Sequence, residues 1–175
     1  MDTLREQIVS GSEKFFDQHG FNGSGMDQLT QAIGVSTRTL YKHAGNKNSL
    51  IAASLKLRSE KFFSSIAATN VDEFFGDLER WLREEGARGC LFLRARGEGL
   101  GFIPEIALII DQYHRQLRDL VADLVDHDAT GDNSELQTQI LVLFEGAVAA
   151  APYAGLQAVF SARSAAATLL DASKR

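Results

Sequence analysis

Apolar residues recur at steps of three and four positions along almost the whole chain, which is the spacing that places them on one face of an α-helix. Short runs rich in Gly, Asn, Ser and Asp interrupt this pattern, and such runs form turns. The pattern predicts helices at about residues 2–19, 26–33, 37–43, 47–66, 71–82, 103–127, 134–151 and 156–171. We therefore expect an all-α fold.

Residues 89–99 fit this pattern least well, because the sequence CLFL within them is equally compatible with a strand. The glycines at 97, 99 and 101 then imitate a nucleotide-binding loop that follows a strand. A short glycine pattern is a weak signal, and no second strand or βαβ unit accompanies it. We reject a nucleotide-binding site here.

Residues 25–50 contain the most specific local pattern, two short helices joined by a turn. Gly34 supplies the left-handed conformation that ends the first helix, and Ser36 is a typical N-cap for the second. Only Leu40 is an obvious inward anchor of the second helix, so most of residues 37–43 face solvent. A helix this short and polar depends on its neighbours for stability, and its donors suit base edges and phosphates in a DNA major groove. We interpret the pair as a helix-turn-helix.

The run GVSTRTLYKHAGNKNSL resembles the DNA-binding signature of the TetR family of transcriptional regulators. In that signature a Gly-Val-Ser turn leads into a Thr-Leu-Tyr recognition helix, followed by a His-aromatic pair, a lysine and an apolar anchor. Residues 21–27 resemble the family's entry to its second helix, with Ser24 in the capping place. The sequence departs from the pattern at Ala44, where an aromatic is usual, and at Gly25, where Ser or Thr is usual. The resemblance covers about residues 4–55.

The resemblance implies a sequence-specific transcriptional regulator, of the repressor type, that a small-molecule effector releases from its operator; an activator is the alternative. We expect Thr37 and Arg38 to reach base edges, and Tyr41, Lys42 and Lys47 to hold phosphates. The expected DNA-binding residues are Ser24, Ser36, Thr37, Arg38, Thr39, Tyr41, Lys42, His43 and Lys47.

The distribution of charge is compatible with DNA, although the formal net charge of −5 at first argues against it. Residues 26–50 contain three basic side chains against Asp27 alone, whereas residues 61–175 contain eleven Lys and Arg against seventeen Asp and Glu. An acidic body with a mildly basic tip still binds DNA, because only the tip meets the phosphates. The basic surplus is small, so we expect two copies to act together on one DNA site.

The helix at about 134–151 has almost no polar face, and such a helix is buried on all sides. In a body of this size one side faces the core, and the other must face a second chain. The resemblance adds that the last two helices form a four-helix dimer interface and that the Gly-Cys-Leu at residues 89–91 begins a short sixth helix. We therefore expect a homodimer through residues 136–171 that binds a near-palindromic operator on double-stranded DNA.

The body also contains more aromatic and mixed side chains than a small core needs, which suggests an effector pocket, although solid packing is the alternative. The expected ligand-binding residues are Phe62, Trp81, Phe92, Tyr113, His114 and Phe144. Arg94 and Arg96 at the mouth would favour an acidic or polar ligand, or else lie on the surface.

Other classes of function find little support in the sequence. The four histidines are scattered without metal-ligand spacing, and no nucleophile elbow, P-loop or dinucleotide fingerprint is present. An Asp111–His114 dyad is more simply a ligand contact or an ordinary pair. We expect no enzymatic activity, no cofactor and no metal, and we expect Cys90 to be a buried apolar residue.

The chain lacks a signal-peptide pattern and a membrane-spanning run, so we expect a cytoplasmic protein with no membrane partner. Two domains are predicted, a helix-turn-helix domain at 1–46 and a helical effector-binding and dimerisation domain at 47–175. The main rival is a helical ligand-binding or interaction protein that keeps the helix-turn-helix only as a scaffold. Exposure of residues 37–38 and 42–43 argues against this rival, since packing does not require those side chains.

Overall fold

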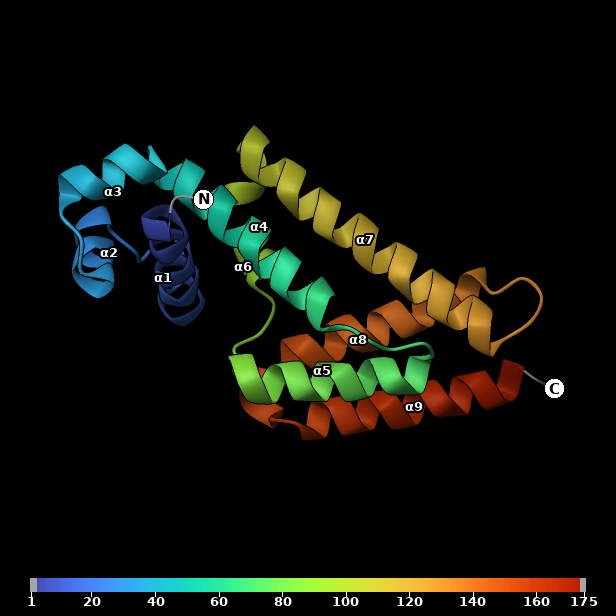
Figure 1. Ribbon diagram of the computed structural model, residues 1–175. Coiled ribbons are helices and arrows are strands. Elements are labelled where there is room, and N and C mark those ends of the chain that lie inside the picture. The colour runs from blue at the N-terminus through green and yellow to red at the C-terminus, as the bar shows by residue number, and fades with distance from the viewer. Residues whose placement is uncertain (1–2, 174–175) are drawn as a thin grey trace. The chain divides into compact units, whose positions relative to one another are not determined.

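The computed structural model describes residues 3–173 and confirms the all-α prediction, since this part of the chain contains helices and no strand (Figure 1). The elements are α1 Thr3–His19, α2 Met26–Ile33, α3 Thr37–Ala44, α4 Lys47–Ser65, α5 Val71–Glu85, α6 Leu91–Gly97, the 3₁₀ turn η1 Leu100–Phe102, α7 Pro104–Asp128, α8 Ser134–Ala154 and α9 Gln157–Ser173.

The chain forms two compact units that are discontinuous in sequence. The first unit comprises the chain up to Lys61 together with Leu91–Tyr113, and the second comprises Phe62–Cys90 together with the chain from His114 onward. Helices α4 and α7 therefore each contribute residues to both units. A division by compactness does not test a division by function, so the boundary after residue 46 stays a prediction.

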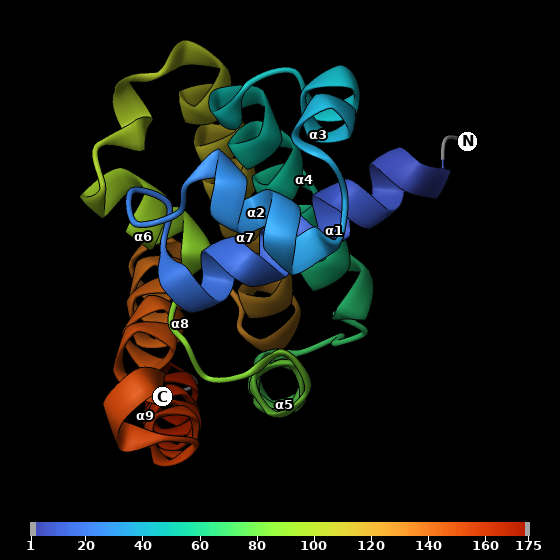
Figure 2. The ribbon, with the colours of Figure 1, turned by 90° about the vertical axis from the view of Figure 1, so that its left-hand side faces the viewer.

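In the first unit, α1 packs against both α2 and α3 (Figure 2). The core between them includes Ile8, Phe16 and Leu29, whose side chains are fully buried. Gly11 lies in the middle of α1 where α2 approaches closely, because a Cβ atom on Gly11 would stand 3.0 Å from Cγ1 of Ile33. The close crossing offsets the roughly 1 kcal/mol that Gly costs in a helix interior relative to Ala.

Helix ends follow local capping rules with one correction. The side chains of Ser36, Asn46 and Asn70 each accept a hydrogen bond from a backbone amide three residues later, which caps α3, α4 and α5. The prediction that Ser24 caps α2 is wrong, because Gly25 is the N-cap residue. Gln28 reaches back from the first turn and accepts a hydrogen bond from the Gly25 amide at 2.8 Å, which satisfies that donor without a capping hydroxyl.

A buried charged cluster joins α1 to α4 inside the first unit. Glu13 is fully buried, and its carboxylate lies 2.5 Å from Nε of Arg58 and 2.9 Å from Nζ of Lys61. Arg58, itself 8% exposed, also lies 3.2 Å from the carboxylate of Asp17. Each buried charge has an opposite charge beside it, so loss of one member removes a counter-charge from the buried groups that remain.

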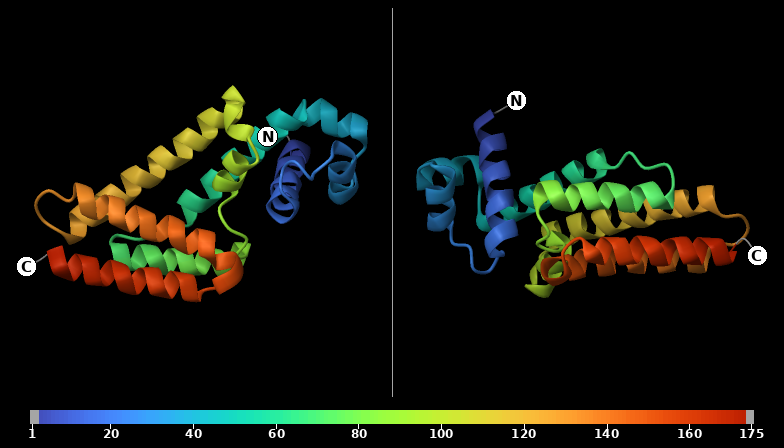
Figure 3. Two further views of the ribbon diagram at one scale, coloured as in Figure 1. Left: turned by 180° about the vertical axis from the view of Figure 1, so that it is seen from behind. Right: turned by 90° about the horizontal axis from the view of Figure 1, so that it is seen from below.

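In the second unit, α8 and α9 run antiparallel side by side, and α5 packs along α9 (Figure 3). Aromatic rings fill the core: Phe74 stacks on Phe144 with 5.0 Å between centroids, and Phe62 contacts both Phe144 and Trp81. The terminal part of α8 differs slightly from expectation, because the helix passes through Pro152 and ends at Ala154 instead of stopping near residue 151.

We predict that Arg58→Ala lowers the free energy of unfolding by about 3–5 kcal/mol, because it leaves the buried carboxylate of Glu13 without one of its counter-charges. Chemical denaturation followed by circular dichroism measures this loss. Lys56→Ala is the matched control, since Lys56 pairs with Glu60 at an exposed position on the same helix and its loss should cost about 0–1 kcal/mol. Equal stability of the two variants would show that the buried cluster is not stabilising.

Candidate nucleic-acid interface

The turn between α2 and α3 depends on the backbone of Gly34. Gly34 has φ 77° and ψ 32°, and its amide donates to the carbonyl of Thr30 at 2.9 Å. The amide of Val35 donates to the same carbonyl at 3.1 Å. The left-handed conformation is costly for a residue with a side chain, so Gly at this position allows α3 to begin with only three residues between it and the end of α2.

Two of the predicted DNA-binding hydroxyls hold the start of α3. Ser36 Oγ accepts from the amide of Thr39 at 3.1 Å and lies 2.8 Å from Thr39 Oγ1. The two side chains therefore fix the first turn of the helix and each other. They determine where the remaining polar side chains of α3 point.

The outward face of α3 is polar, and its inward face is a single leucine. Leu40 is fully buried, whereas Thr37, Arg38 and Lys42 are exposed and Tyr41 is 48% exposed. Four of the nine predicted DNA-binding residues thus share the solvent side of one short helix. This arrangement places hydrogen-bond donors on the exposed side of a short helix, which is how helix-turn-helix proteins present side chains to a major groove.

The far end of α3 is supported from α1. Nε of Arg5 donates to the carbonyl of His43 at 3.3 Å, which satisfies one of the free carbonyls at the end of the helix. His43 itself is partly buried, and Lys47 lies partly buried in the first turn of α4. The periodic pattern did not single out Arg5, because its contact joins residues 38 positions apart.

Ser24, the remaining predicted DNA-binding residue, lies inside the protein. It is fully buried, and its hydroxyl donates to the carbonyl of Gly20. The structure therefore brings Ser24 to the turn between α1 and α2 instead of the exposed face of α3.

The same turn is held by a segment far away in the sequence. The carboxylate of Glu98, just beyond α6, accepts from the amides of Phe21 and Asn22 at 2.9 and 2.5 Å. Nη1 of Arg94 donates to the carbonyl of Asp17 at 2.8 Å. Gly20 permits the approach, since it has φ 78° and a Cβ atom there would lie 2.7 Å from Glu98 Oε1. Residues 94–98 thus fix the entry to the helix-turn-helix, a role that hydrophobic periodicity cannot reveal.

The six predicted ligand-binding residues are divided between the two units. Phe62, Trp81, His114 and Phe144 belong to the second unit, where three of them form the aromatic core. Phe92 and Tyr113 belong to the first unit, where their rings stack with centroids 3.7 Å apart. Of the two arginines considered for a pocket mouth, Arg94 binds the backbone of α1, and Arg96 pairs with Asp111 at 2.8 Å.

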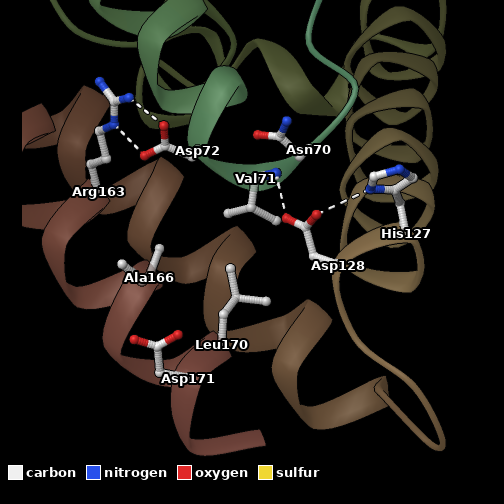
Figure 4. A pocket seen from close by; sticks show the side chains of 10 residues that line it. Asn70, Val71, Asp72, His127, Asp128, Arg163, Ala166, Leu170 and Asp171 are labelled. Carbon is white, nitrogen blue, oxygen red and sulfur yellow. Dashed lines mark hydrogen bonds and ion pairs between the residues drawn. The ribbon is translucent and has the colours of Figure 1, made fainter. Parts of the chain in front are cut away.

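One pocket of about 350 Å³ lies in the second unit at the start of α5 (Figure 4). On one side Asp72 pairs with Arg163, whose hydrogen bond holds the pKa of the Asp72 carboxyl below its usual range. On the other side Asp128 accepts from the amide of Val71 at 2.8 Å. These contacts tie the start of α5 to α7 and α9, so most of the polar groups around this pocket serve the fold.

A second, open groove of about 890 Å³ lies in the first unit along α1 and α4. Small side chains such as Ser10, Ala52 and Ala53 line it, and charged side chains of both signs border it. None of the predicted ligand-binding residues lines either of these two pockets. The helices of the described residues include none with the length and apolarity needed to cross a membrane.

Comparison with known proteins agrees with this geometry. Residues 8–54 match the family described as bacterial regulatory proteins, tetR family. A search of curated proteins found no match.

Solved structures share the fold over almost the whole chain. A TetR-family transcriptional regulator from Streptomyces coelicolor superposes with a TM-score of 0.85 at 21% identity, covering 98% of this chain and 96% of that one. A TetR transcription regulator from Haloarcula marismortui gives 0.84 at 18% identity, covering 99% of each chain. A putative regulator from Streptomyces avermitilis gives 0.76 at 24% identity, covering 98% of each.

We predict that Glu98→Gln loosens the turn before α2, because a neutral amide replaces a carboxylate that accepts hydrogen bonds from two amides. Hydrogen exchange at the amides of Phe21 and Asn22 should accelerate by roughly tenfold or more, which corresponds to about 1.4 kcal/mol. Glu105→Gln, an exposed position in the first turn of α7, is the control and should leave this exchange unchanged. Unaltered exchange in Glu98→Gln would show that the turn between α1 and α2 is stable without the Glu98 carboxylate.

Proposed function

We propose that this protein, a transcriptional regulator of the TetR family, represses its target genes by binding a near-palindromic operator as a homodimer. A small-molecule effector then releases it. The observation that best supports DNA binding is the solvent face of α3, where Thr37, Arg38, Tyr41 and Lys42 are exposed around one buried leucine. Packing does not require this set of side chains, whereas groove recognition does.

On DNA, we propose that Thr37 and Arg38 reach base edges, with Arg38 directed to a guanine. Tyr41, Lys42, His43 and Lys47 bind or approach phosphates and set the register. Ser36 and Thr39 contribute by capping the helix that presents these groups. Ser24 acts indirectly by closing the turn before α2, where its hydroxyl is engaged.

We propose that two copies associate through residues 136–171. The outer face of α8 is formed at steps of four, three and four by Val142, Gly146, Ala149 and Tyr153, all exposed in the isolated chain. Val142 is 63% and Tyr153 84% exposed. An apolar face of this extent favours burial against a second copy, and small residues on it let two helices approach closely.

On α9, Phe160 is 41% exposed and is a further exposed apolar side chain within residues 136–171. A twofold dimer would present two α3 helices to successive turns of the major groove, about 34–36 Å apart. Each copy adds its own phosphate contacts, so the pair compensates for the small basic surplus of one chain.

For the effector, we propose a site in the second unit at Phe62, Trp81, His114 and Phe144. Aromatic surfaces with one polar group beside them suit an amphipathic small molecule. Phe92 and Tyr113 stack within the first unit, and we assign them to its core. The effector releases DNA only if it binds the conformation that cannot bind DNA more tightly than the one that can. A tenfold loss of operator affinity requires a difference of about 1.4 kcal/mol between the effector's binding free energies for the two conformations.

Helix α4 supplies residues to both units, so we propose that it transmits the change. We also propose that the chain divides by function into a DNA-binding domain at 1–46 and an effector-binding and dimerisation domain at 47–175. The cytoplasm, where bacterial operators lie, is the proposed location.

We predict that Arg38→Ala weakens operator binding by about 1–3 kcal/mol and relaxes the preference at one base position, while Lys47→Ala weakens all sequences alike. Gel shifts with the protein's own upstream DNA, and with single-base variants of the bound site, measure both effects. Arg83→Ala is the control, since Arg83 is an exposed arginine on α5 that pairs with Glu79. Unchanged affinity of Arg38→Ala for the operator would refute its assignment, and no DNA binding by the unaltered protein would favour the scaffold alternative.

We predict that Phe160→Glu produces monomers that bind the operator at least tenfold more weakly, because a buried unpaired carboxylate disfavours the interface. Analytical ultracentrifugation gives the oligomeric state. Leu108→Glu places the same charge on an exposed apolar residue of α7 outside the proposed interface and should remain dimeric. A stable monomer for the unaltered protein would contradict the proposed interface.

A further inference from the structure

Glu145 is the only acidic residue within the apolar middle of α8, between residues 136 and 154. Its side chain is 22% exposed, and its Oε1 atom lies 3.8 Å from Nε2 of His114 on α7. The His114 side chain is 18% exposed, so both polar groups lie at the edge of the core of the second unit. The distance is too long for a direct hydrogen bond between these two atoms.

The other carboxylate oxygen of Glu145 is in a more costly position. Oε2 is buried and has no hydrogen-bond partner among residues 3–173. Burial raises the pKa of the Glu145 carboxyl above its usual range. Buried polar atoms in native proteins almost always have a partner, and one without a partner loses stability. Packing alone gives no reason for a glutamate here, since an apolar residue would serve the helix better.

The surroundings of Glu145 indicate what would satisfy it. Phe144, the preceding residue, is in the aromatic cluster with Phe62 and Trp81. Glu145 itself lies at the edge of this aromatic core, next to His114. A carboxylate in that position suits a positively charged group on an apolar body, because the carboxylate accepts the hydrogen bonds of that group. Arg94 and Arg96, which had suggested an acidic ligand, are engaged elsewhere in the first unit.

We infer that Glu145 is the polar recognition group of the effector site and that the effector has a protonated amine or amidine attached to an apolar body. In this role the ligand N–H groups donate to Glu145, with His114 beside them, and the apolar body contacts the aromatic cluster. This inference rests on the proposed function, since it names the ligand class of the proposed effector site.

The test uses the full-length protein and the fluorescence of Trp81, the single tryptophan of the chain, which lies in the aromatic cluster. The probes are 2-phenylethylammonium, its neutral isostere 2-phenylethanol and the anion phenylacetate. We expect the ammonium ion to bind at least tenfold more tightly than the alcohol, and phenylacetate to bind most weakly.

Glu145→Gln should reduce the ammonium preference to within about twofold and leave binding of the alcohol unchanged. Its melting temperature should equal or exceed that of the unaltered protein, because a buried charge is removed. Glu145→Asp keeps the charge and should keep the preference, which guards against a folding defect in the glutamine variant. Glu135→Gln, at the exposed start of the same helix, should behave as the unaltered protein.

The inference is overturned by the absence of saturable 2-phenylethylammonium binding, or by an ammonium preference that survives in Glu145→Gln. The first would leave Glu145 with water as its partner. Because the titration contains no DNA, it gives the same answer whether or not the protein binds an operator. If other small molecules release operator DNA with no dependence on Glu145, the inference fails and the proposed function stands.

Discussion

The structure depends on one constraint: a short polar helix must be held in place by its neighbours. Helix α3 has eight residues, of which one is fully buried, so its own helical propensity and burial cannot position it. Ser36 caps its first turn, Arg5 donates a hydrogen bond to the carbonyl of His43 near its end, and Gly34 forms the turn that joins it to α2. The exposed side chains of α3 that we propose to contact DNA therefore depend on these contacts for their positions.

The neighbours of α3 are in turn fixed by contacts that are distant in sequence. The buried charges of Glu13 and Arg58 join α1 to α4, and Glu98 holds the turn between α1 and α2. Both contacts are charge-assisted, and the Glu13–Arg58 pair is also buried. Apolar contacts are not directional, so they do not by themselves fix the position of one helix along another. The charged contacts are directional and favour one arrangement of the helices in the first unit.

Sequence patterns could predict the helices and most caps, because both depend on residues within four positions of each other. The close crossing at Gly11 also follows locally, since a mid-helix glycine has a cost that packing must offset. The capping role assigned to Ser24 failed because the Gly25–Gln28 bond replaced a hydroxyl cap. Glu98, Arg5 and the Glu13 cluster could not be predicted, because each contact joins residues 38 or more positions apart. Hydrophobic periodicity shows which face of a helix is apolar, but it does not show which charged side chains form pairs.

Helix α8 shows the same limit within the second unit. Because α8 is apolar all around, we expect one side to be buried in its own chain and the other to contact a partner. The inner face is buried, and Phe144 is one of the buried residues on it. Glu145 interrupts this apolar pattern. That its Oε2 atom is buried without a hydrogen-bond partner among the described residues can be seen only in the folded chain. The second unit therefore has a mainly apolar core with polar groups such as Glu145 and His114 at its edge.

Selection of bound fragments from random DNA by the full-length protein, followed by footprinting, tests whether α3 recognises a specific sequence. If it does, we expect an enriched near-palindromic site with two protected half-sites whose centres lie about 34–36 Å apart on one face of the duplex. Enrichment of no sequence, with binding no stronger than to competitor DNA, would contradict the conclusion that α3 is a recognition helix.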